Sequence, residues 1–328
     1  MSKNDQHIRE ISRGFYMIDL PMPFRLGHVN VFLYLHEKRG ILFDTGLNVH
    51  GVMPQLEGAL ATLDLTIECI DDIFLTHFHA DHCGIAGLIK EKSGATIHMS
   101  EKGRGHIERM GKETLIVETM TNFLFRHGFP SKTLDSIMRL FSHFRNVTAP
   151  FEVDEILEGG EIHSIGGRTF EVISTPGHAN GHDCFYFADE GILLSGDHVL
   201  PHITPNLGPD LFDPDYRPLD SFLASLDRVR DLPVTIVCPA HGAPFTDLKG
   251  RVDEIKDHHR ERKALVLESV RQGPKTTYEI SLDVFKDDLS EFDKFLALNE
   301  TYVHLLELMC EGLIGEEKEN GRIIYAAR

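Results

Sequence analysis

The chain has 328 residues, of which 41% are hydrophobic and 26% are charged, and its formal net charge is −18 at pH 7. This composition is ordinary for a globular protein, and the length suits one large domain with or without a smaller second domain. The acidic balance argues against a polyanionic partner over most of the surface, because phosphate contacts require lysine and arginine.

The cellular context is predicted from what the sequence lacks. No run approaches the roughly 20 apolar residues of a membrane span, and the first residues do not have the apolar core of a signal peptide. The cysteines are scattered and contain no C-x-x-C motif: Cys69, Cys83, Cys184, Cys238 and Cys310. We therefore expect reduced thiols, a cytoplasmic location and no membrane partner.

The first 250 residues alternate short apolar runs with amphipathic segments. The apolar runs predict strands at 15–20, 29–36, 40–46, 70–76, 95–100, 168–175, 183–189, 191–197 and 234–240. The amphipathic segments predict helices at 52–63, 84–94 and 216–230. Residues 101–150 carry almost no strand pattern and predict a helical insertion. The pattern as a whole predicts an α/β catalytic domain over residues 1–250.

The chain changes character in residues 251–328. A long helix is expected up to "RQGPKT", followed by two more helices and a hairpin that turns at "ENGR". This order predicts a linker helix and a small winged-helix domain. Residues 273–328 hold 6 lysines and arginines against 12 aspartates and glutamates, whereas a winged helix that grips phosphates is basic. We expect this unit to pack against the first domain or against a partner subunit. In the second case the protein would be a homodimer.

The stretch "THFHADHCG" at residues 76–84 crowds three histidines and an aspartate into seven positions. His77 and His79 are two residues apart and share one side of an extended segment. Asp81 and His82 follow where the chain is expected to turn into a helix. Polar side chains also follow other predicted strands: Asp44, His178, Asp197 and His241. One such residue is usually a cap or a surface group, but their repetition at successive strand ends indicates a metal site.

The residue types identify the chemistry of this site. Imidazole nitrogens and carboxylate oxygens suit zinc and other borderline divalent ions. Two ions need six or seven protein ligands, with one carboxylate shared between them. The predicted ligands of one ion are His77, His79 and His178, and those of the other are Asp81, His82 and His241. Asp197 is the predicted bridge. Asp44 is expected to orient a ligand. We predict Asp81 and Asp197 as catalytic carboxylates, two divalent ions that are zinc or alternatively manganese or iron, and a bridging hydroxide as the nucleophile.

The motifs "THFHADH", "TPGHANGH", "SGDH" and "PAHG" resemble, in this order, those of the metallo-β-lactamase superfamily. The resemblance covers roughly residues 10–250, and it implies an αββα sandwich of two mixed sheets with a dinuclear site at one edge. The seven residues assigned above match the ligands of that family, and Asp44 matches its structural aspartate. A bridging aspartate at 197 is similar to the glyoxalase II, lactonase and nuclease branches. The C-terminal tail resembles that of the group that includes the human β-lactamase-like protein 2, a ribonuclease.

This resemblance leaves three reactions to separate, beside a non-catalytic role in which the winged helix acts as a binding or dimerisation module. We expect hydrolysis of a small ester, thioester or lactone. Cleavage of RNA or another phosphodiester is the first alternative, which the acidic tail weakens. A mononuclear iron persulfide dioxygenase is the second, because it shares the histidine motif.

The insertion at 101–150 differs from the rest of the chain in charge, with 8 lysines and arginines against 5 aspartates and glutamates. It also concentrates five aromatic residues: Phe123, Phe125, Phe129, Phe141 and Phe144. These aromatic residues either form the core of the insertion itself or line a lid over the metal site. Such a lid would accept an anionic substrate with an apolar acyl group, and Arg126 and Arg145 would attract its negative charge toward the metals. The weaker candidates have different expected places: His182 and His198 behind the ligands, His202 and Thr204 in the lining of the pocket, Arg25, His28 and Asn30 near the same edge, and Cys83 beside the ions.

Overall fold

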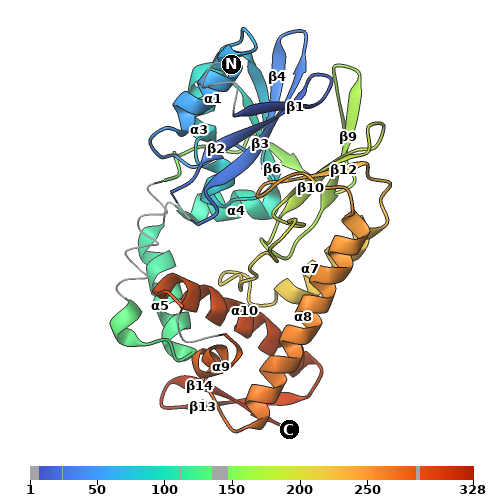
Figure 1. Ribbon diagram of the computed structural model, residues 1–328. Helices are drawn as coiled ribbons and strands as arrows, with labels where there is room; N and C mark the ends of the chain where they lie inside the picture. Colours follow the sequence, from blue (N-terminus) through green and yellow to red (C-terminus); the bar gives the residue numbers. More distant parts are fainter. Residues whose placement is uncertain (1–6, 24, 111, 135–146, 286–288) are drawn as a thin grey trace.

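Two β-sheets stacked face to face form the centre of the molecule, and helices cover their outer faces (Figure 1). The structure, a computed structural model, describes residues 7–23, 25–110, 112–134, 147–285 and 289–328. The predicted α/β architecture with two mixed sheets is confirmed.

The first sheet has its seven strands in sequence order: β1 (Ile8–Ser12), β2 (Phe15–Pro21), β3 (His28–His36), β4 (Arg39–Phe43), β5 (Ile70–Phe74), β6 (Thr96–Ser100) and β7 (Glu155–Leu157). It is antiparallel from β1 to β4 and parallel from β4 to β7. Side chains of β3 alternate between the two faces: Leu33 packs toward the helices, while Phe32 and Tyr34 pack toward the second sheet.

The second sheet has the strand order β12-β11-β10-β9-β8. Its strands are β8 (Ile162–Ile165), β9 (Arg168–Ser174), β10 (Asp183–Phe187), β11 (Ile192–Gly196) and β12 (Ile236–Pro239). Only the β11–β12 pair is parallel among these described pairings. The two sheets meet through a mainly aromatic core that includes Phe43, Phe74, Phe170 and Phe185, so the ends of strands from both sheets are held at one common edge.

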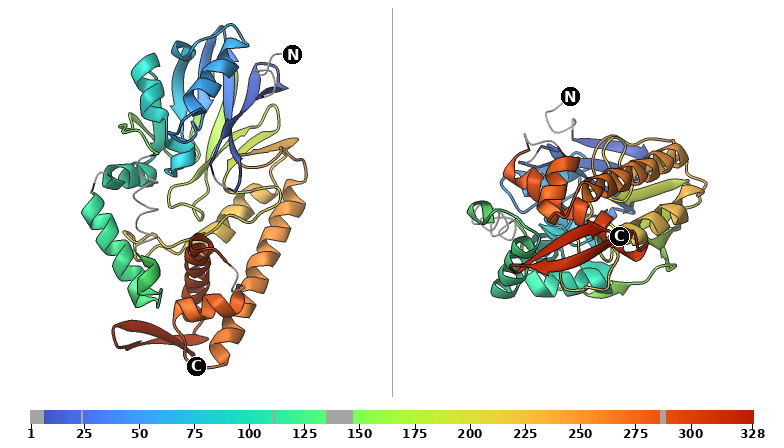
Figure 2. Two further views of the ribbon diagram at one scale, coloured as in Figure 1. Left: turned by 60° about the vertical axis from the view of Figure 1, so that its left-hand side comes forward. Right: turned by 90° about the horizontal axis from the view of Figure 1, so that it is seen from below.

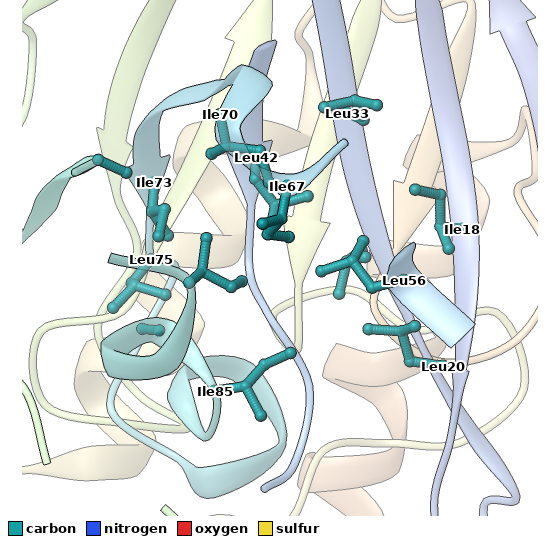
Figure 3. Close-up of a cluster of buried hydrophobic side chains, with 14 of the residues drawn as sticks. Ile18, Leu20, Leu33, Leu42, Leu56, Ile67, Ile70, Ile73, Leu75 and Ile85 are labelled. Atoms are coloured by element: carbon teal, nitrogen blue, oxygen red, sulfur yellow. The ribbon is translucent and has the colours of Figure 1, made fainter. Parts of the chain in front are cut away.

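The helices on the outer face of the first sheet are α1 (Val52–Ala61), α2 (Ala80–Cys83) and α3 (Ala86–Ser93), with the short 3-10 helix η2 (Ile67–Cys69). Figure 3 shows Leu56 and Ile85 facing the aliphatic side chains Leu20, Leu42 and Leu75 in this core. On the second sheet, α7 (Pro218–Arg230) and α8 (Leu248–Arg271) supply the corresponding layer.

The C-terminal unit lies beyond the sandwich and is reached along α8 (Figure 2). It contains α9 (Thr277–Val284), α10 (Glu291–Cys310) and the hairpin of β13 (Ile314–Glu319) and β14 (Arg322–Ala327). The hairpin turns at Asn320 and Gly321, whose φ angles of 51° and 81° are those of the turn predicted at "ENGR". The predicted order of helices and hairpin is therefore present. Its assignment as a winged helix, and a domain boundary after residue 250, stay predictions.

The insertion forms α4 (Glu101–Met110) and α5 (Glu113–Arg126), as its lack of strand pattern predicts. Phe123 and Phe129 are buried with Phe295 and Leu298 of α10. The interpretation of the aromatic residues as the core of the insertion alone is therefore changed, because they pack on the C-terminal unit as well as within the insertion. Phe125 is 41% exposed. Phe141, Phe144 and Arg145 lie outside the described residues.

Some local expectations need correction. Three strands, β1, β7 and β8, occur where the sequence showed no clear alternation. The expected helix at 84–94 is present as α3, which begins two residues later, at Ala86, and it is preceded by the separate short helix α2. Within the described residues, no helix is both long and apolar enough to cross a lipid bilayer.

Candidate metal centre

The predicted ligands converge at the edge where strands of both sheets end. They follow the strands closely: Asp44 after β4, His77 and His79 after β5, His178 after β9, Asp197 after β11, and His241 after β12, with Asp81 and His82 on α2. Their donor atoms form three overlapping sets, each within 4.8 Å: His77, His79 and His178; Asp81, His82 and His241; and His77, His82 and Asp197. We call the first of these the first group and the second the second group.

The first group consists of imidazoles alone. Nδ1 of His79 lies 2.9 Å from Nε2 of His77 and 3.0 Å from Nε2 of His178. Nδ1 of His178 donates to the carbonyl oxygen of Asn206 at 2.9 Å, which leaves the Nε2 lone pair directed at its neighbours. Burial lowers the pKa of His79 to about 3, and it also lowers the pKa values of His77 and His178. The three rings are therefore neutral, as metal binding requires.

The second group mixes imidazoles with a carboxylate. His82 donates from Nδ1 to Asp44 at 2.8 Å, and His241 donates from Nδ1 to the carbonyl oxygen of His28 at 3.1 Å. Nε2 of His241 then lies 3.3 Å from a carboxylate oxygen of Asp81. Burial opposes charge on His82, but Asp81 and Asp44 outweigh it and raise the pKa of His82 well above its usual value. The group thus attracts a positive charge strongly.

Asp197 lies between the two groups. Its Oδ2 is 3.5 Å from Nε2 of His178 and 3.6 Å from Nε2 of His82, and its Oδ1 is 3.4 Å from Nε2 of His241. Burial opposes ionisation, yet His241 and His82 hold the pKa of Asp197 well below its usual range. One carboxylate therefore faces both groups, as the predicted bridge must.

The backbone at Asp197 is held by His182, a buried histidine that the sequence placed behind the ligands. The N–H of Asp197 donates to Nε2 of His182 at 3.2 Å, and Nδ1 of His182 lies 2.8 Å from the hydroxyl of Thr175. Gly196 has a φ of 49°, and a Cβ there would lie 2.6 Å from Nε2 of His182. A glycine is therefore needed for this contact.

These residues fit a divalent-metal site. Nε2 of His82 and Oδ1 of Asp197 are buried and have no hydrogen-bond partner, which is costly for polar atoms. Because Nδ1 of His82, His178 and His241 each faces an oxygen acceptor, Nε2 is the nitrogen that each ring presents to the carboxylates and to the other ligands. Lone pairs and carboxylates that converge in this way are satisfied by cations.

Asp44 supports the site from behind. Its carboxylate accepts from the Nδ1 of His82 and from both the backbone N–H and the hydroxyl of Thr76. Thr76 immediately precedes His77, and its hydroxyl also lies 3.0 Å from Nδ1 of that residue. The φ of Asp44 is 60°, an unusual value that a functional contact can maintain. The prediction that Asp44 orients a ligand agrees with this geometry.

α4 of the insertion contacts the segment that carries the histidine motif. The ring of His106 stacks on Phe78 with centroids 3.9 Å apart. Nε2 of His106 lies 3.1 Å from Asp210, which also accepts from the amide of Asn180 at 2.8 Å. These three residues, His106, Asp210 and Asn180, were not predicted. The only signal in the sequence is that Asn180 lies two residues after His178.

The weaker candidates have varied positions. Asn30 is buried, and its amide donates to the carbonyl oxygens of Pro239 and Gly242 on either side of His241. The Cys83 thiol is buried and donates to the carbonyl oxygen of Phe78. His198 is buried against Phe222. Arg25 and His202 are exposed and Thr204 is half-buried.

Comparison with known proteins adds relatives that align over nearly the whole chain. The chain is 27% identical over 320 residues to the probable metallo-hydrolase YqjP of Bacillus subtilis, covering 94% of this chain and 96% of the relative. It is 25% identical over 323 residues to the β-lactamase-like protein 2 homolog of Caenorhabditis elegans, covering 92% and 90%. A shorter match, 25% over 181 residues, covers 52% of this chain and 56% of an atrochrysone carboxyl ACP thioesterase of Claviceps purpurea.

A solved structure is similar in both fold and sequence. The metallo-beta-lactamase family protein TTHA1429 of Thermus thermophilus superposes with a TM-score of 0.86 and is 32% identical, covering 97% of this chain and all of that one. The family model of the metallo-beta-lactamase superfamily matches residues 24–241, which include every predicted ligand. The chain therefore belongs to the metallo-β-lactamase superfamily and is a metal-dependent hydrolase of that family.

Proposed function

We propose that this protein is a dinuclear hydrolase of a small carboxylic ester, thioester or lactone. The observation that carries the proposal is the position of the Asp197 carboxylate, which faces His178 of the first group and both His82 and His241 of the second. His77, His79 and His178 would hold one ion, Asp81, His82 and His241 the other, and Asp197 would contact both. When bound, such ions supply Lewis acidity and make water a nucleophile near neutral pH.

The side chains have distinct tasks in this proposal. Asp81 keeps its negative charge at neutral pH: burial opposes ionisation, but His82 lowers the pKa of Asp81 to about 2. Asp81 and Asp197 together provide the charge that retains cations among neutral imidazoles. His106 and Phe78 border the approach and limit the shape of a substrate.

Two observations support acyl over phosphoryl substrates. A relative carries the name of an acyl carrier protein thioesterase. The net charge of −18 opposes a long polyanion such as RNA. Zinc is the proposed metal, since histidine and carboxylate ligands in this number suit it, with manganese and iron as the alternatives.

We also propose that the C-terminal helices and hairpin form a winged-helix unit used for packing within the chain or between subunits. Its acidic balance supports this role over nucleic-acid binding. The five free cysteines support a reducing, cytoplasmic location.

The test begins with metal analysis, followed by assays on defined substrates. Protein purified with zinc supplied should hold two ions per chain and hydrolyse members of a panel of thioesters and lactones, which should include neutral and anionic compounds of graded acyl length. A bis-phosphodiester and a short RNA complete the panel. Activity confined to the phosphodiesters would replace the proposal by the nuclease alternative. One bound iron with oxygen uptake on a persulfide would replace it by the dioxygenase alternative.

A further inference from the structure

The loop between β11 and α7 connects the metal centre to the C-terminal unit. This loop contains Asn206, whose backbone carbonyl oxygen accepts the hydrogen bond from Nδ1 of His178 at 2.9 Å. The bond selects the tautomer of His178 whose Nε2 lone pair faces the first group. The position of the Asn206 backbone therefore determines the direction of this lone pair.

The side chain of Asn206 is attached to α10. Its amide donates to the carbonyl oxygen of Leu296 at 3.1 Å and lies 3.5 Å from Oε2 of Glu300. Leu296 and Glu300 are one helical turn apart, so Asn206 contacts a single site on the helix. Any displacement of α10 along its axis would thus move the acceptor of His178.

Glu300 is itself fixed by α8. Its side chain is buried, and Oε1 lies 3.2 Å from Nε of Arg262 and 3.6 Å from Nε2 of His258. Burial opposes ionisation of the carboxyl, but His258 and Arg262 lower the pKa of Glu300 below its usual value. The carboxylate thereby ties α8 to α10 at the level of Asn206.

His258, His259 and Glu300 also lie close enough together to suggest a separate metal site. The guanidinium of Arg262, however, already places a permanent positive charge beside the same carboxylate oxygen. An additional cation would have to displace it. The arrangement is better explained as an ion pair that holds two helices than as a third ion site.

We infer that Glu300 and Asn206 are positioning residues of the metal centre, through which α8 and α10 hold His178 in its ligating orientation. The inference rests on the proposed function, because it assumes that the first group binds an ion. It extends the site to a helix that begins about 50 residues after the last predicted ligand, His241, and it assigns the C-terminal unit a part in metal affinity.

The test measures zinc affinity by competition with a chelator, one group at a time. The affinity of the first group is measured in a His241→Ala background, and that of the second group in a His79→Ala background. Asn206→Ala and Glu300→Gln are introduced into each. Loss of a group that orients a ligand typically weakens metal binding by about 10–100-fold, and we expect this loss at the first group with little change at the second.

Glu311→Gln is the matched control. Glu311 directly follows the last residue of α10 and also pairs with α8, through Nζ of Lys263 at 2.6 Å, but it is exposed. It should leave both affinities unchanged. Asn206→Ala provides a second route to the result if Glu300→Gln disturbs folding, because it leaves the pair of Glu300 and Arg262 intact.

The outcomes separate the inference from the proposed function. Wild-type protein that binds no zinc would refute the proposed function. Wild-type protein that binds two ions, with folded variants of unchanged affinity, would refute only the positioning role. Equal weakening of zinc affinity at both groups would indicate general loosening of the structure and would also overturn the positioning role.

Discussion

The two halves of the metal centre differ in how they are prepared for a cation. The first group is made of neutral imidazoles, and burial keeps the pKa values of His77 and His178 low. In the second group, Asp81 and Asp44 raise the pKa of His82. The second group therefore attracts positive charge electrostatically, whereas the first relies on the direction of its nitrogen lone pairs.

The two halves also differ in what supports them. His241 is held by the first sheet, through the carbonyl oxygen of His28 and the amide of Asn30. His178 is held by a loop that is attached to α10 (Figure 1). The geometry of the second group thus comes from the sandwich, and that of the first group also depends on the C-terminal unit.

The largest effect is expected where the two halves meet. Asp197→Asn removes the negative charge that faces both groups, so activity should fall by at least roughly 100-fold and zinc affinity should weaken at both groups. Metal analysis and kcat/KM measurements check this, with the exposed turn residue Asp189→Asn as the control. Near-normal turnover in a folded variant would remove Asp197 from the site, and loss of one ion alone would assign it to one group.

Asn30→Ala should weaken the second group selectively. Its amide makes hydrogen bonds of 2.9 Å and 2.8 Å that hold the backbone around His241. Losing these buried bonds should lower the free energy of unfolding by about 1–3 kcal/mol and reduce zinc affinity at the second group. Urea denaturation and chelator competition measure the two effects, and Asn122→Ala on the exposed face of α5 is the control. A larger loss at the first group would contradict the division of supports.

Acid should loosen the support of the first group through His127. This histidine is buried between α5 and α9, where Nδ1 lies 2.8 Å from the hydroxyl of Thr277. Burial, aided by Arg126, lowers the pKa of His127 to about 3, below the roughly 6.5 of an unfolded chain. As the pH falls below 6.5, the unfolded state therefore binds this proton before the folded state does. The stability that neutral His127 provides is fully present above pH 6.5 and is lost as the pH falls toward 3.

At pH 5 this loss amounts to about 2 kcal/mol for one histidine. His127→Gln should therefore reduce, by about 2 kcal/mol, the fall in the unfolding free energy between pH 7.5 and 5, measured by urea denaturation of the metal-free protein. The exposed His50→Gln provides the comparison. An unchanged slope in the His127 variant would show that this group does not carry the effect.

The smallest effect is expected at Cys83, which adjoins His82 but donates its thiol to the carbonyl oxygen of Phe78. Cys83→Ala should cost roughly 1 kcal/mol of stability from the lost packing. Two ions per chain should remain, and kcat/KM should change by only a few-fold. Elemental analysis that finds the second group's ion missing would place Cys83 among its ligands.

Much of the fold followed from local patterns. The apolar runs of β3 and β11 predicted buried strands, and the turn at "ENGR" predicted the final hairpin. These features depend on neighbours within a few residues, which a single sequence displays directly. The edge strand β1 and the short β7 and β8 lacked such a pattern, because their side chains are mostly only half-buried or exposed.

The amino-acid sequence by itself determined the candidate ligands, since His77, His79, Asp81 and His82 are close along the chain and the others directly follow strands. Only the tertiary structure decided what holds them. Asn206 precedes Glu300 by 94 positions, and Asn30 lies 212 positions before Gly242. The insertion likewise packs on α10 by contacts that no local pattern contains. Metal ligands are recognisable from their own chemistry, whereas a supporting amide or carboxylate has a role only through the partner that folding brings to it.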